Sequence, residues 1–408
     1  MTTDFLTDLD DELLTRLRGV YRELHQQPEL SLKEHKTAER IEAELSSLDV
    51  EVQRIGGTGV VAMIRNGAGP TVLARADTDA LPVSEQTGLD YASEVEGAMH
   101  ACGHDMHVAT LLGAIELLVN HKDAWAGTYI GLFQPAEETA QGAQAMLDDG
   151  LVEKIPTPDV AFSQHVMPTE AGTIGTSPGP VLSAGDSLKI TVYGRGAHGS
   201  MPHNSVDPVV LASSIVMRLQ TIVSRETQPG QFAVVTVGAL NAGSKSNIIA
   251  DRAELLLNLR TYDAALREQI MAAIERIVRA ECQAAGSPQE PGFEYYDQFP
   301  LTDNDPTVNA KVTEAFTEAF GADAVYETKP YTASEDFSRI PNAFGIPYAY
   351  WFIGSVEPDK YRRAVEQGTV SQDIPANHSP FFAPEFDPTL EIGIRTQVVA
   401  VLAYLAQD

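Results

Sequence analysis

The stretch TVLARADTDALP, residues 71–82, indicates the fold of the chain. Its apolar first half, residues 71–76, is typical of a buried β-strand, and charged side chains follow directly. Helical patterns separate it from similar apolar runs bounded by Gly, Pro and Asp, which cover residues 59–64, 128–133, 159–162 and 348–353. This alternation of strands and helices predicts an α/β domain with a largely parallel sheet.

A different order of elements is predicted within residues 186–298. The pattern gives strand 187–193, helix 207–224, strands 231–239 and 250–260, helix 263–285 and strand 292–296. This βαββαβ order is the ferredoxin-like arrangement. We therefore predict one α/β domain, residues 1–185 and 299–408, interrupted by a smaller inserted domain, residues 186–298. A chain of 408 residues is long enough for two hydrophobic cores.

The composition argues against several classes of protein. The 57 acidic and 28 basic side chains give a net charge of 28 − 57 = −29, and 43% of the residues are hydrophobic. That apolar fraction is typical of a folded globular protein and not of a disordered acidic chain. We expect no nucleic-acid partner, because neutralising phosphates requires a basic surface.

The two cysteines, Cys102 and Cys282, are too few and too far apart to suggest a disulfide framework. The acidic N-terminus lacks the pattern of a signal peptide. The most apolar stretch, residues 108–119, is too short to span a bilayer. We therefore expect a cytoplasmic protein with reduced thiols and no membrane partner.

Polar clusters follow three of the predicted strands, namely RADTDALP (75–82), QPAEE (134–138) and QHV (164–166). A fourth cluster, MHACGHDMH (99–107), leads into a predicted helix. Ligands of open α/β sheets bind at the carboxyl ends of the strands. We therefore expect these clusters to converge on one site.

Cys102 and His104 give the strongest metal-binding signal. Residues two apart point to the same side of an extended segment, so a thiolate and an imidazole can reach one cation such as zinc. The same segment is also consistent with a buried or redox-active cysteine beside a helix that Asp105 caps.

Glu137 and Glu138 follow an apolar strand and are suited to two different tasks. One carboxylate can bind a metal ion while the other takes a proton from a water activated by that ion. A solvent-exposed acidic pair is the alternative interpretation. His165 follows a strand in the same way and His378 lies in a Pro-flanked loop, but each histidine taken singly is also consistent with a structural role.

Three further polar residues lie in the predicted inserted domain. A glycine-rich turn, GRGAHGSMPH (194–203), presents His198, while Asn247 precedes a predicted strand and Arg260 closes one. Their spacing alone does not separate a binding role from an ordinary role in turns and surface ion pairs.

Taken together, these motifs resemble a metallopeptidase family that includes aminoacylases and carboxypeptidases acting on N-acyl amino acids. The match is closer to the amidohydrolase branch, with hippurate hydrolases and the plant auxin-conjugate (IAA-amino acid) hydrolases. The resemblance covers nearly the whole chain. The motifs that carry it are YRELHQQPEL (21–30), RADTDALP, MHACGHDMHVA, QPAEE, GRGAHGSMPH, ASEDF (333–337) and NHSPFF.

The resemblance implies a two-metal catalytic domain interrupted by a ferredoxin-like lid, through which the chain forms a homodimer or a tetramer. The metal ligands that it implies are Cys102, His104, Glu138, His165 and His378. It implies that Glu137 is the general base and that Asp77 orients the ligands. His198 would complete the site, often across the dimer, and Asn247 and Arg260 would contact the substrate carbonyl or carboxylate.

The chain departs from the family pattern at Arg75. The aminoacylase and carboxypeptidase branches have a histidine ligand at this place, whereas arginine does not deprotonate and cannot bind a metal ion. Cys102 and His104 would supply the replacement ligands, as in the amidohydrolase branch. We expect two divalent ions, with zinc favoured by the cysteine and with manganese, cobalt or nickel as alternatives.

The sequence therefore predicts a metal-dependent amidohydrolase that cleaves N-acyl amino acids, its small-molecule substrates, into a carboxylic acid and a free amino acid. A dipeptidase and a deacetylase of the N-acetyl-diaminopimelate type are alternatives that would use the same site. A non-catalytic metal-binding protein is a more distant alternative, because Glu137 and all five implied ligands are present.

Overall fold

The structure, a computed structural model, describes residues 9–406 and divides the chain into two compact units. Unit 1 runs up to Val181 and continues in Asp303–Lys329 and from Asp336 onward. Unit 2 comprises Leu182–Thr302 and Pro330–Glu335, so that the predicted insertion lies within it. Each unit has its own hydrophobic core.

Unit 1 is built on an eight-stranded sheet with the strand order β1-β2-β4-β3-β5-β16-β6-β15. Its strands are β1 (Glu51–Ile55), β2 (Gly59–Asn66), β3 (Thr71–Asp77), β4 (Gly127–Gln134), β5 (Val160–Glu170), β6 (Ile174–Thr176), β15 (Val325–Glu327) and β16 (Tyr348–Val356). The adjacent strands β4, β3, β5 and β16 are parallel, whereas β1, β2 and β4 pair antiparallel and so do β6 and β16. With the parallel pair β6 and β15, four of the seven strand pairs are parallel, so the sheet is mixed and the predicted parallel pairing holds for its centre. The pair β1 and β2 is antiparallel because a short turn joins these strands, whereas a parallel pair needs a crossover connection.

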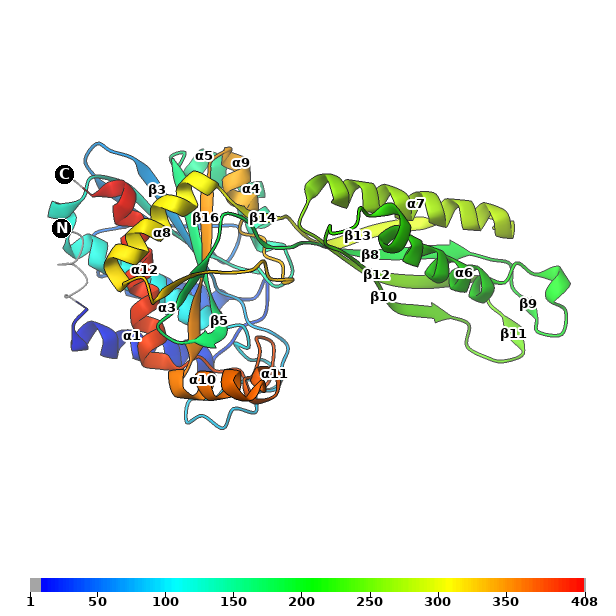
Figure 1. Cartoon of the computed structure of the whole chain (residues 1–408), viewed down its shortest axis with the longest axis horizontal. Helices are drawn as coiled ribbons and strands as arrows, with labels where there is room; N and C mark the ends of the chain where they lie inside the picture. Colours follow the sequence, from blue (N-terminus) through cyan, green and yellow to red (C-terminus); the bar gives the residue numbers. More distant parts are fainter. Residues whose placement is uncertain (1–8, 407–408) are drawn as a thin grey trace. The chain divides into compact units, whose positions relative to one another are not determined.

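Helices cover the sheet of unit 1. They are α1 (Asp11–Gln26), α2 (His35–Leu45), α3 (His104–Asn120), the 3-10 turn η2 (Lys122–Ala124), α4 (Gly142–Asp148), α5 (Leu151–Lys154), α8 (Pro306–Phe320), α9 (Arg339–Phe344), α10 (Pro358–Gln367), α11 (Val370–Asp373) and α12 (Phe386–Leu405). Helix α3 packs against both α1 and α12 (Figure 1) and is buried along nearly its whole length, which explains why it is apolar all round. Within residues 9–406, none of the helices combines the length and the apolar character needed to cross a bilayer.

Unit 2 contains a four-stranded antiparallel sheet with the order β10-β12-β8-β13. Its main elements follow one another as β8 (Ala184–Tyr193), α6 (Pro208–Thr221), β10 (Ala233–Ala242), β12 (Arg252–Thr261), α7 (Ala264–Ala285) and β13 (Gly292–Phe299). Helices α6 and α7 contact each other and the sheet (Figure 1). Their apolar faces form the core with β8 and β12. The shorter elements of unit 2 are β9 (Ala197–His198), η3 (Pro202–Asn204), η4 (Ile222–Glu226) and β11 (Ile248–Ile249). The strands β7 (Gly179–Leu182) and β14 (Thr302–Asn304) pair with each other, and most of their residues belong to unit 1.

Strand β5 is longer than predicted and carries a polar cluster within it. Its pairing with β3 ends at Ser163, opposite Arg75, whereas its pairing with β16 continues to Glu170. His165 therefore lies inside the strand, opposite Phe352, and not beyond its end as predicted. Because β3 and β5 are paired only up to Ser163, the ladder between them does not extend to His165.

Candidate metal centre

Cys102 and His104 lie at the start of α3, separated by a glycine that the geometry requires. Gly103 has a φ of 84° and occupies the N-cap position of the helix. A Cβ atom at this residue would lie 2.4 Å from Cγ2 of Val166. Only glycine tolerates both the left-handed backbone and this close approach, so the Cys-Gly-His triplet fixes where the thiol and the imidazole lie.

The five implied ligands come together in unit 1 from four separate segments. Sγ of Cys102 lies 3.4 Å from Nε2 of His165. Oε1 of Glu138 lies 3.4 Å from Nε2 of His378 and 3.8 Å from Nε2 of His104. Donor atoms within 4.8 Å of one another form overlapping groups, which are Asp77, His104, His107 and His165; Cys102, Glu138 and His378; and His104, Glu137 and Glu138.

Some of the buried donor atoms lack a hydrogen-bond partner, and carboxylates surround them. Among the described residues, neither ring nitrogen of His104 nor the buried Oε1 of Glu138 has a hydrogen-bond partner. Burial, followed by the charge of Glu138, raises the pKa of the Cys102 thiol well above its ordinary value. Burial opposes a charge on His104, but Asp77 and Asp79 outweigh it and raise the pKa of His104 to about 10. Divalent cations neutralise such a set of thiol and carboxylate donors, so the residues fit a two-metal site.

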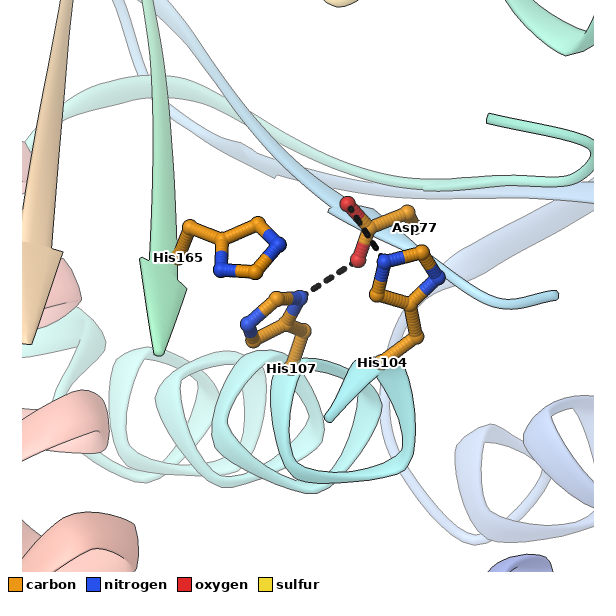
Figure 2. Close-up of side chains that lie close together, drawn as sticks. All are labelled: Asp77, His104, His107 and His165. Atoms are coloured by element: carbon orange, nitrogen blue, oxygen red, sulfur yellow. Dashed lines mark hydrogen bonds and ion pairs between the residues drawn. The ribbon is translucent and has the colours of Figure 1, made fainter. Parts of the chain in front are cut away.

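Asp77 is held in place at the end of β3 by two buried neighbours. His107 donates from Nδ1 to Oδ1 of Asp77 over 2.5 Å (Figure 2), and Nε2 of His107 accepts the N–H of Val166 at 2.9 Å. Both ring nitrogens of His107 are thus occupied by hydrogen bonds, and the imidazole is fixed against Asp77. Burial would raise the pKa of Asp77, but His104, His107 and Arg75 hold it well below its ordinary value.

Arg75 forms a buried network beside this carboxylate. Its Nη1 lies 2.7 Å from Oδ2 of Asp77, and its Nε donates to Oε1 of Gln134 over 3.0 Å. Oδ1 of Asp336 lies 3.4 Å from Nη2 of Arg75 and accepts from Nε2 of Gln134. The ASEDF motif thus supplies a second carboxylate that balances the charge of Arg75.

The loop that carries Glu137 and Glu138 is fixed through its backbone. Asp79 accepts the N–H groups of Glu137 and Glu138 over 3.0 and 3.1 Å, and Glu34 accepts the N–H of Ala136 over 2.9 Å. Ala136 has a φ of 46°, an unusual conformation for a residue other than glycine. The two carboxylates hold this strained turn in the position that brings Glu137 beside the metal ligands.

His378 approaches the same ligands from a loop between α11 and α12. Its φ of 68° is also left-handed, and its N–H donates to the carbonyl of Ala101 over 2.8 Å. Asn377 donates to the carbonyl oxygens of Cys102 and Val166. The loop is therefore attached to the segment that carries the thiol, and His378 remains more than half exposed, at 55% of its side chain.

The remaining implied site residues belong to unit 2. His198 is exposed, pairs with Ile248 across β9 and β11, and lines a cavity of about 590 Å³ together with Asn247. Arg260 is half-buried and donates to Oδ1 of Asn258 over 2.9 Å and to the hydroxyl of Ser334. Burial lowers the pKa of Arg260, and the charge of Asp186 opposes this effect.

Several buried residues in and around the site have no role assigned from the motifs. Asp79 and His107 lie in the quoted motifs RADTDALP and MHACGHDMH. The available signal was their spacing, which is two residues from Asp77 to Asp79 and three residues, about one helical turn, from His104 to His107. His25, in the YRELHQQPEL motif, contacts Asp105 over 2.6 Å and has no counterpart in any spacing pattern, because 80 residues separate the two.

This arrangement defines a metal-dependent hydrolase: an α/β fold presents cysteine, histidine and carboxylate ligands around a further carboxylate suited to proton transfer. More particularly, the chain belongs to peptidase family M20/M25/M40, whose sequence model matches residues 73–373. The family resemblance predicted from the motifs is thereby confirmed.

Known relatives cover nearly the whole chain. Thermostable carboxypeptidase 2 of Saccharolobus solfataricus is 37% identical over 94% of this chain and 94% of its own length. N-acetyl-L-cysteine deacetylase of Bacillus subtilis is 38% identical over 84% of this chain and 81% of its own. The crystal structure of the Bacillus subtilis YXEP protein, a dinuclear metal-binding peptidase of family M20, superposes with a TM-score of 0.78 at 29% identity, covering 97% of this chain and 99% of that one. These relatives support a two-metal hydrolase that acts on C–N amide bonds.

Proposed function

We propose that the protein hydrolyses the amide bond of N-acyl amino acids and releases a carboxylic acid and a free amino acid. The observation that carries this proposal is the position of Glu137, whose carboxylate lies within 4.8 Å of donor atoms of His104 and Glu138. The deacetylase relative, named for an N-acyl amino acid, agrees with this substrate class.

The proposed site residues have two tasks, because five of them would bind the metal ions and Glu137 would transfer a proton. Cys102, His104, Glu138, His165 and His378 would hold two divalent ions. When bound, such ions polarise the substrate carbonyl and lower the pKa of an attacking water. Glu137 takes the proton of that water and passes it to the leaving nitrogen. Zinc is the proposed metal because of the cysteine ligand, with manganese, cobalt and nickel as alternatives.

Unit 2 is proposed to be the ferredoxin-like lid and the dimerisation domain. Its βαββαβ order and its antiparallel sheet support the ferredoxin-like description. The apolar side chains of Val210 and Met217 on α6 are 63% and 72% exposed, which favours contact with a second copy of the chain. A homodimer is the simplest assembly, and a tetramer built from such dimers is the alternative.

Three residues of unit 2 are proposed to recognise the substrate. His198 and Asn247 would donate to the carbonyl oxygen as it gains negative charge. Arg260 would bind the carboxylate of the amino acid. Among the described residues no carboxylate forms an ion pair with Arg260, whose hydrogen-bond partners are Asn258 and Ser334, so its charge is available for an anion.

A second candidate function is the cleavage of a C-terminal peptide bond, which the name of the carboxypeptidase relative favours. Cleavage of dipeptides and deacetylation of N-acetyl-diaminopimelate-type substrates are further alternatives that would use the same site. The cytoplasm is the proposed location, because both cysteines are free thiols.

A substrate panel on metal-depleted enzyme, reconstituted with one metal at a time, tests the proposal. The panel sets acetyl-, benzoyl- and fatty-acyl amino acids against dipeptides, each with a free and an amidated carboxyl group. We expect acyl amino acids with a free carboxylate to have the highest kcat/KM. Preferential cleavage of dipeptides would support the second candidate, and no hydrolysis with any metal would refute both.

A further inference from the structure

Asp79 connects two parts of the site that the proposed mechanism treats separately. The residue follows β3, its side chain is 1% exposed, and Oδ1 accepts the N–H of Glu137 over 3.0 Å. The same oxygen lies 3.4 Å from Nδ1 of His104. One carboxylate oxygen thus contacts both the residue proposed as the base and the ring of a proposed ligand.

The second oxygen of Asp79 fixes the carboxylate itself. Oδ2 accepts the N–H of Glu138 over 3.1 Å and the hydroxyl of Ser31 over 2.6 Å. Ser31 belongs to the loop before α2, so the carboxylate is held from three segments of the chain. With both oxygens occupied in this way, Asp79 cannot rotate without releasing the Glu137–Glu138 backbone.

The position of Asp79 also selects the donor atom of His104. A carboxylate facing Nδ1 favours the proton on that nitrogen and leaves the lone pair on Nε2. Nε2 of His104 lies 3.7 Å from Oδ2 of Asp77 (Figure 2). It also lies 3.8 Å from Oε1 of Glu138, one of the proposed ligands. The imidazole is therefore directed toward the other ligands by the same group that holds the loop.

We propose that Asp79 is a positioning residue of the hydrolytic site, which orients His104 for metal binding and at the same time sets the distance between the metal ligands and Glu137. This inference rests on the proposed function. Asp79 thereby links proton transfer to metal binding, because a displacement of Asp79 would move Glu137 and change the orientation of His104 at the same time.

The test is Asp79→Asn, which keeps the shape but places an amide N–H₂ against groups that donate. With a good N-acyl amino acid substrate, kcat falls by about 10- to 100-fold with KM nearly unchanged. Cobalt alone serves as the probe of the ligands: the visible absorption spectrum of the cobalt-loaded variant shifts, and its cobalt affinity falls by about 10- to 100-fold. Asp149→Asn is the matched control, because this exposed carboxylate also accepts a backbone N–H, from Gly56, away from the site.

The outcomes separate this inference from the proposed function. The inference is overturned if the Asp79→Asn variant has the same cobalt absorption spectrum, cobalt affinity and kcat as the wild type. It is also overturned if the loss of activity only follows the fraction of unfolded protein. If the Asp79→Asn variant does not fold, Ser31→Ala replaces it, because this change removes only one hydrogen bond to Oδ2 of Asp79. We expect Ser31→Ala to lower kcat by about 2- to 10-fold and to shift the cobalt absorption spectrum in the same way. An unchanged spectrum in Ser31→Ala overturns the inference. If wild-type enzyme hydrolyses no acyl amino acid, the proposed function fails, while the cobalt measurements still test Asp79.

Discussion

The guanidinium of Arg75 and the carboxylate of Asp77 lie 2.7 Å apart, and both side chains are fully buried. A permanent cation thus lies beside Asp77 and, together with His104 and His107, keeps the pKa of this carboxylate well below its ordinary value. Asp77 in turn binds His107 and faces His104. Arg75 acts on the metal site through electrostatics and does not bind an ion.

Arg75→Met should destabilise the protein by about 3–5 kcal/mol, because it removes the permanent positive charge beside the buried Asp77. Urea unfolding of the metal-depleted protein measures the loss. Arg65→Met is the matched control, since it breaks an exposed pair with Glu51 and should change the free energy of unfolding by less than about 1 kcal/mol. Equally small losses in both variants would contradict the structural role of Arg75.

Glu137→Gln should retain its metal content and lose turnover by roughly 10²- to 10⁴-fold, because only proton transfer is removed. Glu138→Gln, the neighbouring control, should lose metal as well as activity. Elemental analysis and steady-state kinetics on both variants separate the two roles. A Glu137→Gln enzyme with near-wild-type kcat would exclude Glu137 as the base.

Metal binding should release protons and weaken as the pH falls. Without a cation the pKa of His104 is raised to about 10 and the pKa of the Cys102 thiol lies well above its ordinary value, so both groups are protonated at pH 7. Binding must displace these protons, and the apparent affinity therefore rises with pH. Calorimetry of zinc binding in buffers of different ionisation enthalpy counts the protons. Cys102→Ala should release about one proton fewer, and heats that do not depend on the buffer would contradict the prediction.

His25 should make the protein less stable at alkaline pH. Burial lowers the pKa of His25, but hydrogen bonds and charges from Asp105 and Glu85 outweigh this effect and raise it from 6.5 to about 9. The stabilisation is fully present below pH 6.5 and is lost as the pH rises through 9, a loss on the order of 3 kcal/mol.

Urea unfolding between pH 6 and 10 measures this loss. His25→Gln should remove that part of the pH dependence. His35→Gln changes an exposed histidine of the same unit and should leave the dependence as in the wild type. A His25→Gln profile that coincides with the wild-type profile would refute the assignment.

Strands and helices with a clear local pattern could be predicted from the sequence. The helix predicted over residues 263–285 is α7 (Ala264–Ala285), which begins directly after the capping Asp263. Strand β5 shows the limit, because its length depends on the partner strand β16 and not on its own apolar run. The mixed direction of the sheet was missed for the same reason, since strand pairing is a long-range property.

The site could be predicted as a set of residues but not as a set of contacts. The motifs predicted Cys102, His104 and Glu138 as metal ligands, and the side chains of these residues lie close together in the structure. The groups that hold them, such as Asp79 and His107, have the same residue types as ordinary capping or core residues. Only the folded geometry, which places Asp79 against Glu137, distinguishes their roles.

The backbone anchoring of the loop at Ala136–Glu138 has an evolutionary consequence. Asp79 and Glu34 bind its main-chain N–H groups, so these contacts do not involve the side chains that the loop carries. A single mutation at Glu137 would therefore leave a folded protein that still binds its ions and its substrate. Such a lineage is one step from becoming a sensor or a carrier of the molecules that its ancestor destroyed.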